Sequence, residues 1–200
     1  MKGEDNILTM NPPPHRKTVR HYNNPNDCHE LTFSCYRRQP LLNADERCQL
    51  LSHAIDAAIP RLGFSLLAFV YMPEHLHLLV WPKTPGTEIA DLLFAIKRPF
   101  SFRVKKLLQA NGDPLLQALT IRERPGKMSF RFWQEGGGYD RNLFSLETAR
   151  VAAEYIHNNP VRRGLCQSPG DWKWSSWRHY HLPSEPPDSD LPRVDGFPMG

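Results

Sequence analysis

The sequence predicts an α+β domain in which helices lie on one face of an antiparallel sheet. Two features predict this class. Segments rich in β-forming residues alternate with segments whose apolar residues recur at the spacing of a helix face. Two apolar segments, 64–72 and 75–81, are separated only by the corner Pro73-Glu74, which is typical of a hairpin. The 200 residues are enough for one such domain with arms at its ends.

The first elements expected are a strand and a helix that precede this hairpin. Residues 28–36 alternate loosely and are rich in β-formers, so they predict the first strand. Asn43 is expected to cap the helix, and Pro60 and Gly63 are expected to end it. Its apolar face would consist of Leu50, Leu51, Ala54, Ile55, Ala58 and Ile59.

The second half of the chain predicts two more helices and one more strand. A helical pattern covers residues 87–110, where Pro99 is expected to break or kink the helix. Residues 129–133 predict a short strand, and a last helix is expected to begin at the cap Ser145 and to end before Pro160. The order β, α, β, β, α, β, α fits a ferredoxin-like sandwich with an added C-terminal helix.

Proline and charge divide the chain into three parts. Prolines gather near both ends, which predicts a proline-containing arm over residues 1–27, a folded domain over 28–182 and a tail over 183–200. The tail has a local charge of −3, so we expect it to be disordered and to be repelled by nucleic acid.

Composition also limits the cellular setting. The four cysteines form no CxxC pair, so we expect free thiols in a reducing cytoplasm. The N-terminal residues lack the apolar run of a signal peptide, and the longest apolar segments have about half of the roughly 20 residues that span a bilayer. We therefore expect no secretion and no membrane span.

His75 and His77 lie two residues apart on a predicted strand. Residues at this spacing point to the same face, so both imidazoles can reach one metal ion. The intervening Leu76 and the following Leu78 point to the opposite face, where they can pack against a helix. The alternative is a pair of partly exposed cross-strand partners. A second such pattern, His179-Tyr180-His181, has no strand pattern around it and is expected at the surface.

Tyr155 and Asn159 lie four residues apart at the end of the last predicted helix, so they share a helix face. The alternative is a half-buried tyrosine and a helix-capping asparagine. Together with the two histidines, however, the amide oxygen completes a three-ligand site for Mg²⁺ or Mn²⁺. The tyrosine hydroxyl could then attack a phosphorus that the metal polarises. Tyr139, after a glycine-rich loop, is a second candidate nucleophile.

The middle of the chain is strongly basic. Between residues 97 and 131, nine basic residues stand against two acidic ones, a local charge of +7 that exceeds the net +4 of the whole chain. Aromatic residues interleave with them, as in grooves that bind single-stranded nucleic acid. The alternative is solvated lysines on a helix whose phenylalanines belong to the core. The DNA-binding residues predicted here are Lys97, Arg98, Arg103, Lys105, Lys106 and Arg131, with Arg162 and Arg163 after the last helix.

Five separated blocks in the order of this chain resemble the signature of the REP-associated tyrosine transposases, within the single-tyrosine HUH family. The blocks are the segment 69–80 with its His-Leu-His, Phe132-Trp133-Gln134, Tyr139-Asp140, the segment 155–165 with Tyr-Ile and Asn-Pro-Val, and 171–176. The resemblance covers about residues 28 to 180. The glycine triplet 136–138 replaces a loop that is usually less glycine-rich in the family, and the proline-rich arms have no counterpart in the family pattern.

The resemblance implies a ferredoxin-like catalytic domain that acts on single-stranded DNA with hairpins. It implies that His75, His77 and Asn159 bind Mg²⁺ or Mn²⁺ and that Tyr155 is the nucleophile. The function expected is nicking and rejoining of DNA through a covalent 5′-phosphotyrosine. The alternative is a domesticated protein that binds hairpin DNA without cutting it. A zinc hydrolase would need an Asp where Leu79 stands. The sequence leaves open whether the protein is a monomer or a homodimer.

Overall fold

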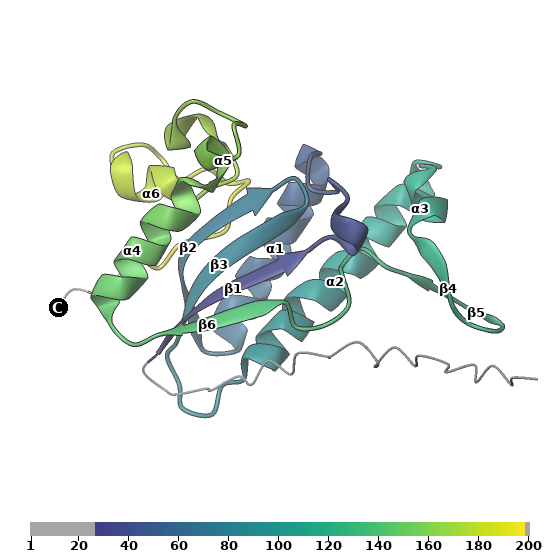
Figure 1. The fold of residues 1–200 in the computed structure, drawn as a ribbon, viewed down its shortest axis with the longest axis horizontal. Coiled ribbons are helices and arrows are strands. Elements are labelled where there is room, and N and C mark those ends of the chain that lie inside the picture. The colour runs from purple at the N-terminus through teal and green to yellow at the C-terminus, as the bar shows by residue number, and fades with distance from the viewer. Residues whose placement is uncertain (1–26, 199–200) are drawn as a thin grey trace, which may run out of the picture.

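A computed structural model describes residues 27–198, and within them a four-stranded antiparallel sheet forms the centre of the molecule (Figure 1). The strands are β1 (Cys28–Ser34), β2 (Phe64–Met72), β3 (His75–Pro82) and β6 (Tyr139–Leu143), in the spatial order β2-β3-β1-β6. The α+β prediction is therefore confirmed. The connectivity and the strand order are those of a ferredoxin-like sandwich.

The fourth strand of the sheet differs from the one expected. The predicted strand 129–133 overlaps β5 (Lys127–Phe130), which pairs only with β4 (Thr120–Arg124) in a separate hairpin. This hairpin projects away from the sheet (Figure 1). The edge position beside β1 is taken instead by β6, a largely polar strand in which Tyr139 and Arg141 are exposed.

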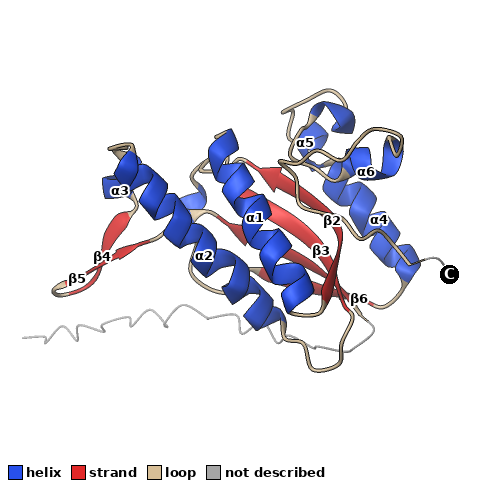
Figure 2. Cartoon of the chain, turned by 180° about the vertical axis from the view of Figure 1, so that it is seen from behind, coloured by secondary structure: helices blue, strands red, loops and turns tan. Residues whose placement is uncertain are grey.

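Two helices cover one face of the sheet, as Figure 2 shows from behind. They are α1 (Asp45–Arg61) and α2 (Ile89–Ala110). Pro99 does not end α2, which continues through it. A proline inside a helix costs about 3 kcal/mol, but burial of several large side chains on the same helix offsets that cost. The buried residues of α2 are Ile89, Leu92, Leu93, Ile96, Phe100, Val104 and Leu108.

The added helix α4 (Leu146–His157) packs on the opposite face of the sheet. Small residues on α4 contact apolar residues of β2 and β3, which lets the helix lie close to the strands. The cap predicted at Ser145 is confirmed, because its hydroxyl accepts a hydrogen bond from the Thr148 N–H at 3.1 Å. The cap predicted at Asn43 is wrong, since α1 begins after Ala44 without a side-chain cap.

Short helical elements complete the described chain. They are η1 (Tyr36–Arg38), α3 (Leu115–Ala118), α5 (Asn159–Arg162), η2 (Pro169–Asp171) and α6 (Trp177–His181). All four cysteines are free thiols, as predicted. Among the described residues, no helix has the length and apolar character needed to cross a membrane. The predicted arm 1–27 lies outside the described residues except for Asp27.

The C-terminal tail, predicted to be disordered, is docked along the domain as far as residue 198. Asp195 exchanges two hydrogen bonds with the main chain of Leu66 on the edge strand β2, its N–H donating at 2.9 Å and its carboxylate accepting at 3.0 Å. Leu191 and Val194 pack against the core, and Asp190 pairs with Lys173 at 2.7 Å. The acidic residues of the tail therefore pair within the protein, which is why the charge argument for disorder fails.

We predict that Asp195→Ala destabilises the protein by about 1 kcal/mol, because the Leu66 N–H on the edge strand loses its carboxylate acceptor. Urea denaturation followed by circular dichroism measures this change. The matched control is Glu185→Ala, which removes an exposed ion pair with Arg178 in the same tail and should change stability by less than about 0.5 kcal/mol. Equal effects of the two substitutions would contradict a specific role for Asp195.

Candidate active site

The two histidines of β3 lie on the sheet face that α4 covers. Leu76 and Leu78 belong to the core beneath α1 and α2, so the alternation of the strand turns His75 and His77 the other way. Their Nε2 atoms are 3.2 Å apart. Two nitrogens each about 2.1 Å from one ion lie about 3.2 Å apart when the angle at the ion is near 100°. The spacing of the pair therefore fits joint ligation of one metal ion.

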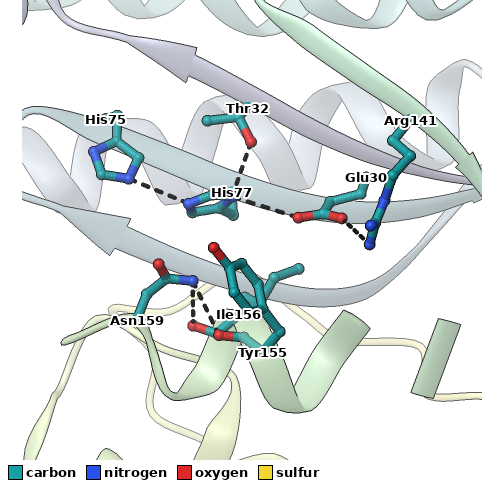
Figure 3. A network of polar contacts seen from close by, with 8 residues as sticks. All are labelled: Glu30, Thr32, His75, His77, Arg141, Tyr155, Ile156 and Asn159. Carbon is teal, nitrogen blue, oxygen red and sulfur yellow. Dashed lines mark hydrogen bonds and ion pairs between the residues drawn. The ribbon is translucent and has the colours of Figure 1, made fainter. Parts of the chain in front are cut away.

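The other ring nitrogen of each histidine faces an oxygen. The Nδ1 atom of His77 lies 2.8 Å from the Thr32 hydroxyl and 3.8 Å from the Glu30 carboxylate (Figure 3). The Nδ1 atom of His75 lies 3.2 Å from the Glu74 carboxylate. An N–H at Nδ1 satisfies these acceptors and leaves the lone pair on Nε2, the arrangement common among metal-binding histidines. Two Nε2 lone pairs at this distance repel unless a cation lies between them.

Burial keeps both rings in the neutral form that metal binding requires. It lowers the pKa of His77 to about 4, and the neighbouring His75 contributes in the same direction. Burial also lowers the pKa of His75, although Glu74 partly opposes the effect. At neutral pH neither imidazole competes with a metal by binding a proton at Nε2.

Two arginines neutralise the carboxylates behind the histidines. Arg141 on β6 pairs with Glu30 at 2.6 Å, and Arg163 pairs with Glu74 at 2.7 Å. Burial acts to raise the pKa of Glu74, but hydrogen bonding from Arg163 and the charge of His75 outweigh it and lower the pKa. The Glu74 carboxylate thus stays ionised and holds the His75 imidazole by its Nδ1 side.

Tyr155 and Asn159 approach the histidines from the end of α4. Asn159 is buried, and its Nδ2 donates to the carbonyls of Tyr155 at 3.0 Å and Ile156 at 3.4 Å. These bonds fix the amide, and Oδ1 accepts no hydrogen bond from the residues that the structure describes. In Figure 3 the phenol of Tyr155 extends from the helix toward the strand that carries His77, and Asn159 lies beside it. The four residues chosen from the sequence therefore face one region.

Tyr155 keeps a free surface while its ring is held in place. It is 43% exposed, and the Arg162 guanidinium lies 4.6 Å from the ring centroid. The same guanidinium places a positive charge beside the phenol, where a phosphate would be attracted. Of the predicted DNA-binding residues, Arg162 and Arg163 are the two that the structure brings to this site.

The rival nucleophile Tyr139 lies on the same sheet face. It pairs with Thr32 on β1, and Thr32 in turn pairs with His77 on β3. Its side chain is 55% exposed, so it is accessible to a substrate. Tyr139 lies on a strand and has no amide ligand one helical turn away, in contrast to Tyr155.

The donor set of His75, His77 and Asn159 suits a divalent metal ion. Two neutral imidazole nitrogens and one amide oxygen give three ligands, a combination that divalent metal ions accept. Sequence reasoning missed Glu30, Thr32, Glu74 and Arg141. Glu30 and Thr32 lie two residues apart on the first strand, so the sequence indicates that they share one face of the sheet. Their proximity to His77 depends on the pairing of β1 with β3, which the sequence of β1 alone does not indicate.

The basic residues of α2 lie on the opposite face of the sheet from the histidines. Two of them stack on exposed rings: the Arg98 guanidinium lies 5.3 Å from the centroid of Phe94, and Lys106 Nζ lies 4.7 Å from that of Phe102. Phe94 was missed by sequence reasoning. Other aromatic residues in and beside the basic segment, Phe100, Phe132 and Trp133, form part of the core instead. The other predicted α2 cations are Lys97, Arg103 and Lys105.

A cavity of about 510 Å³ lies between α2 and the β4–β5 hairpin. Lys97 and Arg98 line it, together with Arg131 from the segment that follows β5. Lys97 is tucked inward, where its Nζ donates to the Gly136 carbonyl at 3.1 Å, and burial lowers its pKa to about 8. Arg131 already pairs with Glu135 at 3.2 Å. Lys97 and Arg131 are therefore less free to bind phosphate than the exposed cations.

Comparisons with known proteins identify the fold. No protein-family model matches the chain, and no curated protein matches its sequence. The structure of the REP-associated tyrosine transposase bound to a REP hairpin is similar, with a TM-score of 0.64, 21% identity and coverage of 92% of this chain and 95% of that one. A protein from Deinococcus radiodurans R1, described as a transposase, aligns with a TM-score of 0.43, 22% identity and coverage of 72% of this chain and 97% of that one. The chain shares the fold of the first of these proteins.

Proposed function

We propose that this protein is a metal-dependent endonuclease and transposase that nicks and rejoins single-stranded DNA at hairpin-bearing, REP-like sequences. The observation that carries the proposal is the convergence of His75, His77, Tyr155 and Asn159 from separate elements on one region. The shared fold with a REP-associated tyrosine transposase supports it, because that protein is bound to a REP hairpin. The chemistry assigned to each residue is our inference from the site.

His75, His77 and Asn159 would hold Mg²⁺ or Mn²⁺. The ion would withdraw electron density from the scissile phosphate and neutralise charge that develops on it. Thr32 and Glu74 would fix the imidazoles through their Nδ1 atoms, so that both Nε2 lone pairs face the ion. The hydrogen bond from Asn159 Nδ2 to the Tyr155 carbonyl would keep Asn159 Oδ1 turned away from the helix and available to the ion.

Tyr155 would act as the nucleophile. Its Oη forms a bond to the phosphorus while the bond between the phosphorus and the 3′ oxygen breaks. The phenolic proton passes to solvent, and the departing 3′ oxygen takes up a proton to become a hydroxyl. The 5′ end stays attached to Tyr155, and a 3′ hydroxyl can attack this linkage to rejoin DNA. Arg162, beside the ring, would attract the phosphate during both steps.

The DNA on either side of the scissile phosphate would need a wider contact surface. The exposed cations and rings of α2 offer one, since arginine and lysine bind phosphates and exposed phenylalanines stack on bases. Because α2 and the histidines lie on opposite faces of the sheet, we propose that the DNA passes around the β6 edge. The free thiols agree with the cytoplasmic location that we propose.

We predict that Tyr155→Phe abolishes the covalent DNA adduct, slowing its formation more than about a thousandfold, because the nucleophilic oxygen is lost. The assay is incubation of a hairpin-bearing single-stranded oligonucleotide with Mn²⁺, followed by denaturing electrophoresis. Tyr139→Phe is the matched control and should form the adduct at the normal rate. An adduct that persists in Tyr155→Phe and vanishes in Tyr139→Phe would reassign the nucleophile. Hairpin binding with no cleavage under any metal would favour the domesticated binding protein.

We predict that Thr32→Val raises the Mn²⁺ concentration needed for half-maximal cleavage by about 10-fold to 100-fold, because His77 loses the partner of its Nδ1 atom. Thr87→Val, far from the site in sequence and on the loop before α2, should leave this concentration unchanged. Hairpin affinity in the presence of chelator should be the same in both variants. If Thr32→Val cleaved normally at limiting Mn²⁺, the positioning role of Thr32 would be wrong.

We predict that the combined variant Arg98→Gln, Arg103→Gln, Lys106→Gln binds hairpin DNA more weakly and with a smaller salt dependence. Each lost phosphate contact should reduce the slope of log affinity against log salt by about 1. Fluorescence anisotropy over a range of salt concentrations measures this slope. Arg61→Gln, an exposed cation at the end of α1, is the control. An unchanged slope in the triple variant would exclude α2 from the DNA path.

A further inference from the structure

A second group of metal-ligating side chains lies between α4 and α6. The potential ligand atoms of Glu154, His157 and His181 all lie within 4.8 Å of one another. Glu154 and His157 are three residues apart on α4, so they share one side of that helix. His181 ends α6 and belongs to the second His-x-His pattern, which the active site does not use. None of the three belongs to the candidate active site.

His157 supplies the strongest evidence for a ligand. Its side chain is completely buried, and its Nε2 lies 2.8 Å from the Ser176 hydroxyl. Ser176 Oγ also donates to the Phe69 carbonyl at 3.2 Å and accepts from the Phe69 N–H at 2.8 Å. In the tautomer in which His157 donates from Nε2 to Ser176, whose own proton serves the Phe69 carbonyl, the lone pair of His157 lies on Nδ1.

The Nδ1 atom of His157 has no hydrogen-bond partner among the described residues and no contact with solvent. A buried acceptor without a partner is unfavourable in a folded protein and calls for an explanation. A bound cation would satisfy this lone pair.

The other two side chains are placed to complete the site. His181 Nε2 lies 3.6 Å from the nearer carboxylate oxygen of Glu154, longer than a hydrogen bond. The His181 ring stacks on Trp177, with centroids 4.4 Å apart and planes inclined by 15°, which holds its orientation. Glu154 and His181 are exposed, so solvent can supply a further ligand.

We propose that Glu154, His157 and His181 bind a second divalent metal ion, of which Zn²⁺ is the best match. Two imidazoles and one carboxylate, with an open position for water, are a zinc ligand set. This set differs from the active site, where a neutral amide oxygen takes the place of the carboxylate. The ion would link α6 to α4, the helix that carries Tyr155. The proposal is independent of the chemistry assigned to Tyr155.

The test isolates the second site by removing the first. In the full-length double variant His75→Ala, His77→Ala, titration with Zn²⁺ in competition with a chromogenic chelator should show one bound equivalent. Adding His181→Ala should weaken this binding more than about tenfold, because a ligand is lost. Adding His179→Ala, which removes the neighbouring histidine of the same pattern, should leave it unchanged. Undetectable binding to the double variant, or equal binding after His181→Ala, would overturn the proposal.

A second measurement covers the case in which the double variant does not fold. Glu154→Gln alters only an exposed side chain, so the otherwise unchanged protein should retain its structure. The unaltered protein should bind two equivalents of Zn²⁺, which raise its thermal unfolding midpoint, and Glu154→Gln should bind one equivalent tightly. If both proteins bind the same number of equivalents with the same affinity, Glu154 is not a ligand and the three-residue site is wrong.

Discussion

The site depends on one constraint: the Nε2 atoms of His75 and His77 face each other 3.2 Å apart on the partly buried face of β3. In the tautomer with both protons on Nδ1, two lone pairs face each other at this distance and repel, so the surroundings must hold them. Apolar packing of Leu76 and Leu78 on the other face fixes the strand. Thr32 and the carboxylates of Glu30 and Glu74 then hold the rings by their Nδ1 atoms. Each layer of the sandwich therefore contributes to the geometry of the histidines.

The packing of α4 on the sheet fixes the position of Tyr155 relative to the two histidines. Ala149, Ala152 and Ala153 face the sheet, and their small side chains allow the helix axis to approach the strands. A register shift between Leu66 and Ala68 on β2 turns two successive residues, Leu67 and Ala68, toward α4. The helix thus rests on a locally widened apolar surface. The end of α4 is set against β3 by this contact, so Tyr155 and Asn159 reach the region of His77.

The parts of the site that the sequence predicts are those fixed by local periodicity. A period of two places His75 and His77 on one face, and a period near four places Tyr155 and Asn159 on another. The partners of the histidines could not be predicted, because Glu30 meets His77 only through pairing of β1 with β3, and Arg141 only through pairing of β1 with β6. Such pairings join residues far apart in the sequence, and local pattern carries no information about them.

The glycine triplet shows how the two faces of the molecule are connected. Gly138 has a φ of +86°, and a side chain there would collide with the Thr32 carbonyl. Thr32 is the residue that contacts His77, so the loop lies directly against the support of the metal ligands. Gly136, at the other end of the triplet, accepts the hydrogen bond from Lys97 and lines the cavity beside α2. The triplet therefore lies between Lys97 of α2 and Thr32, the residue that supports His77.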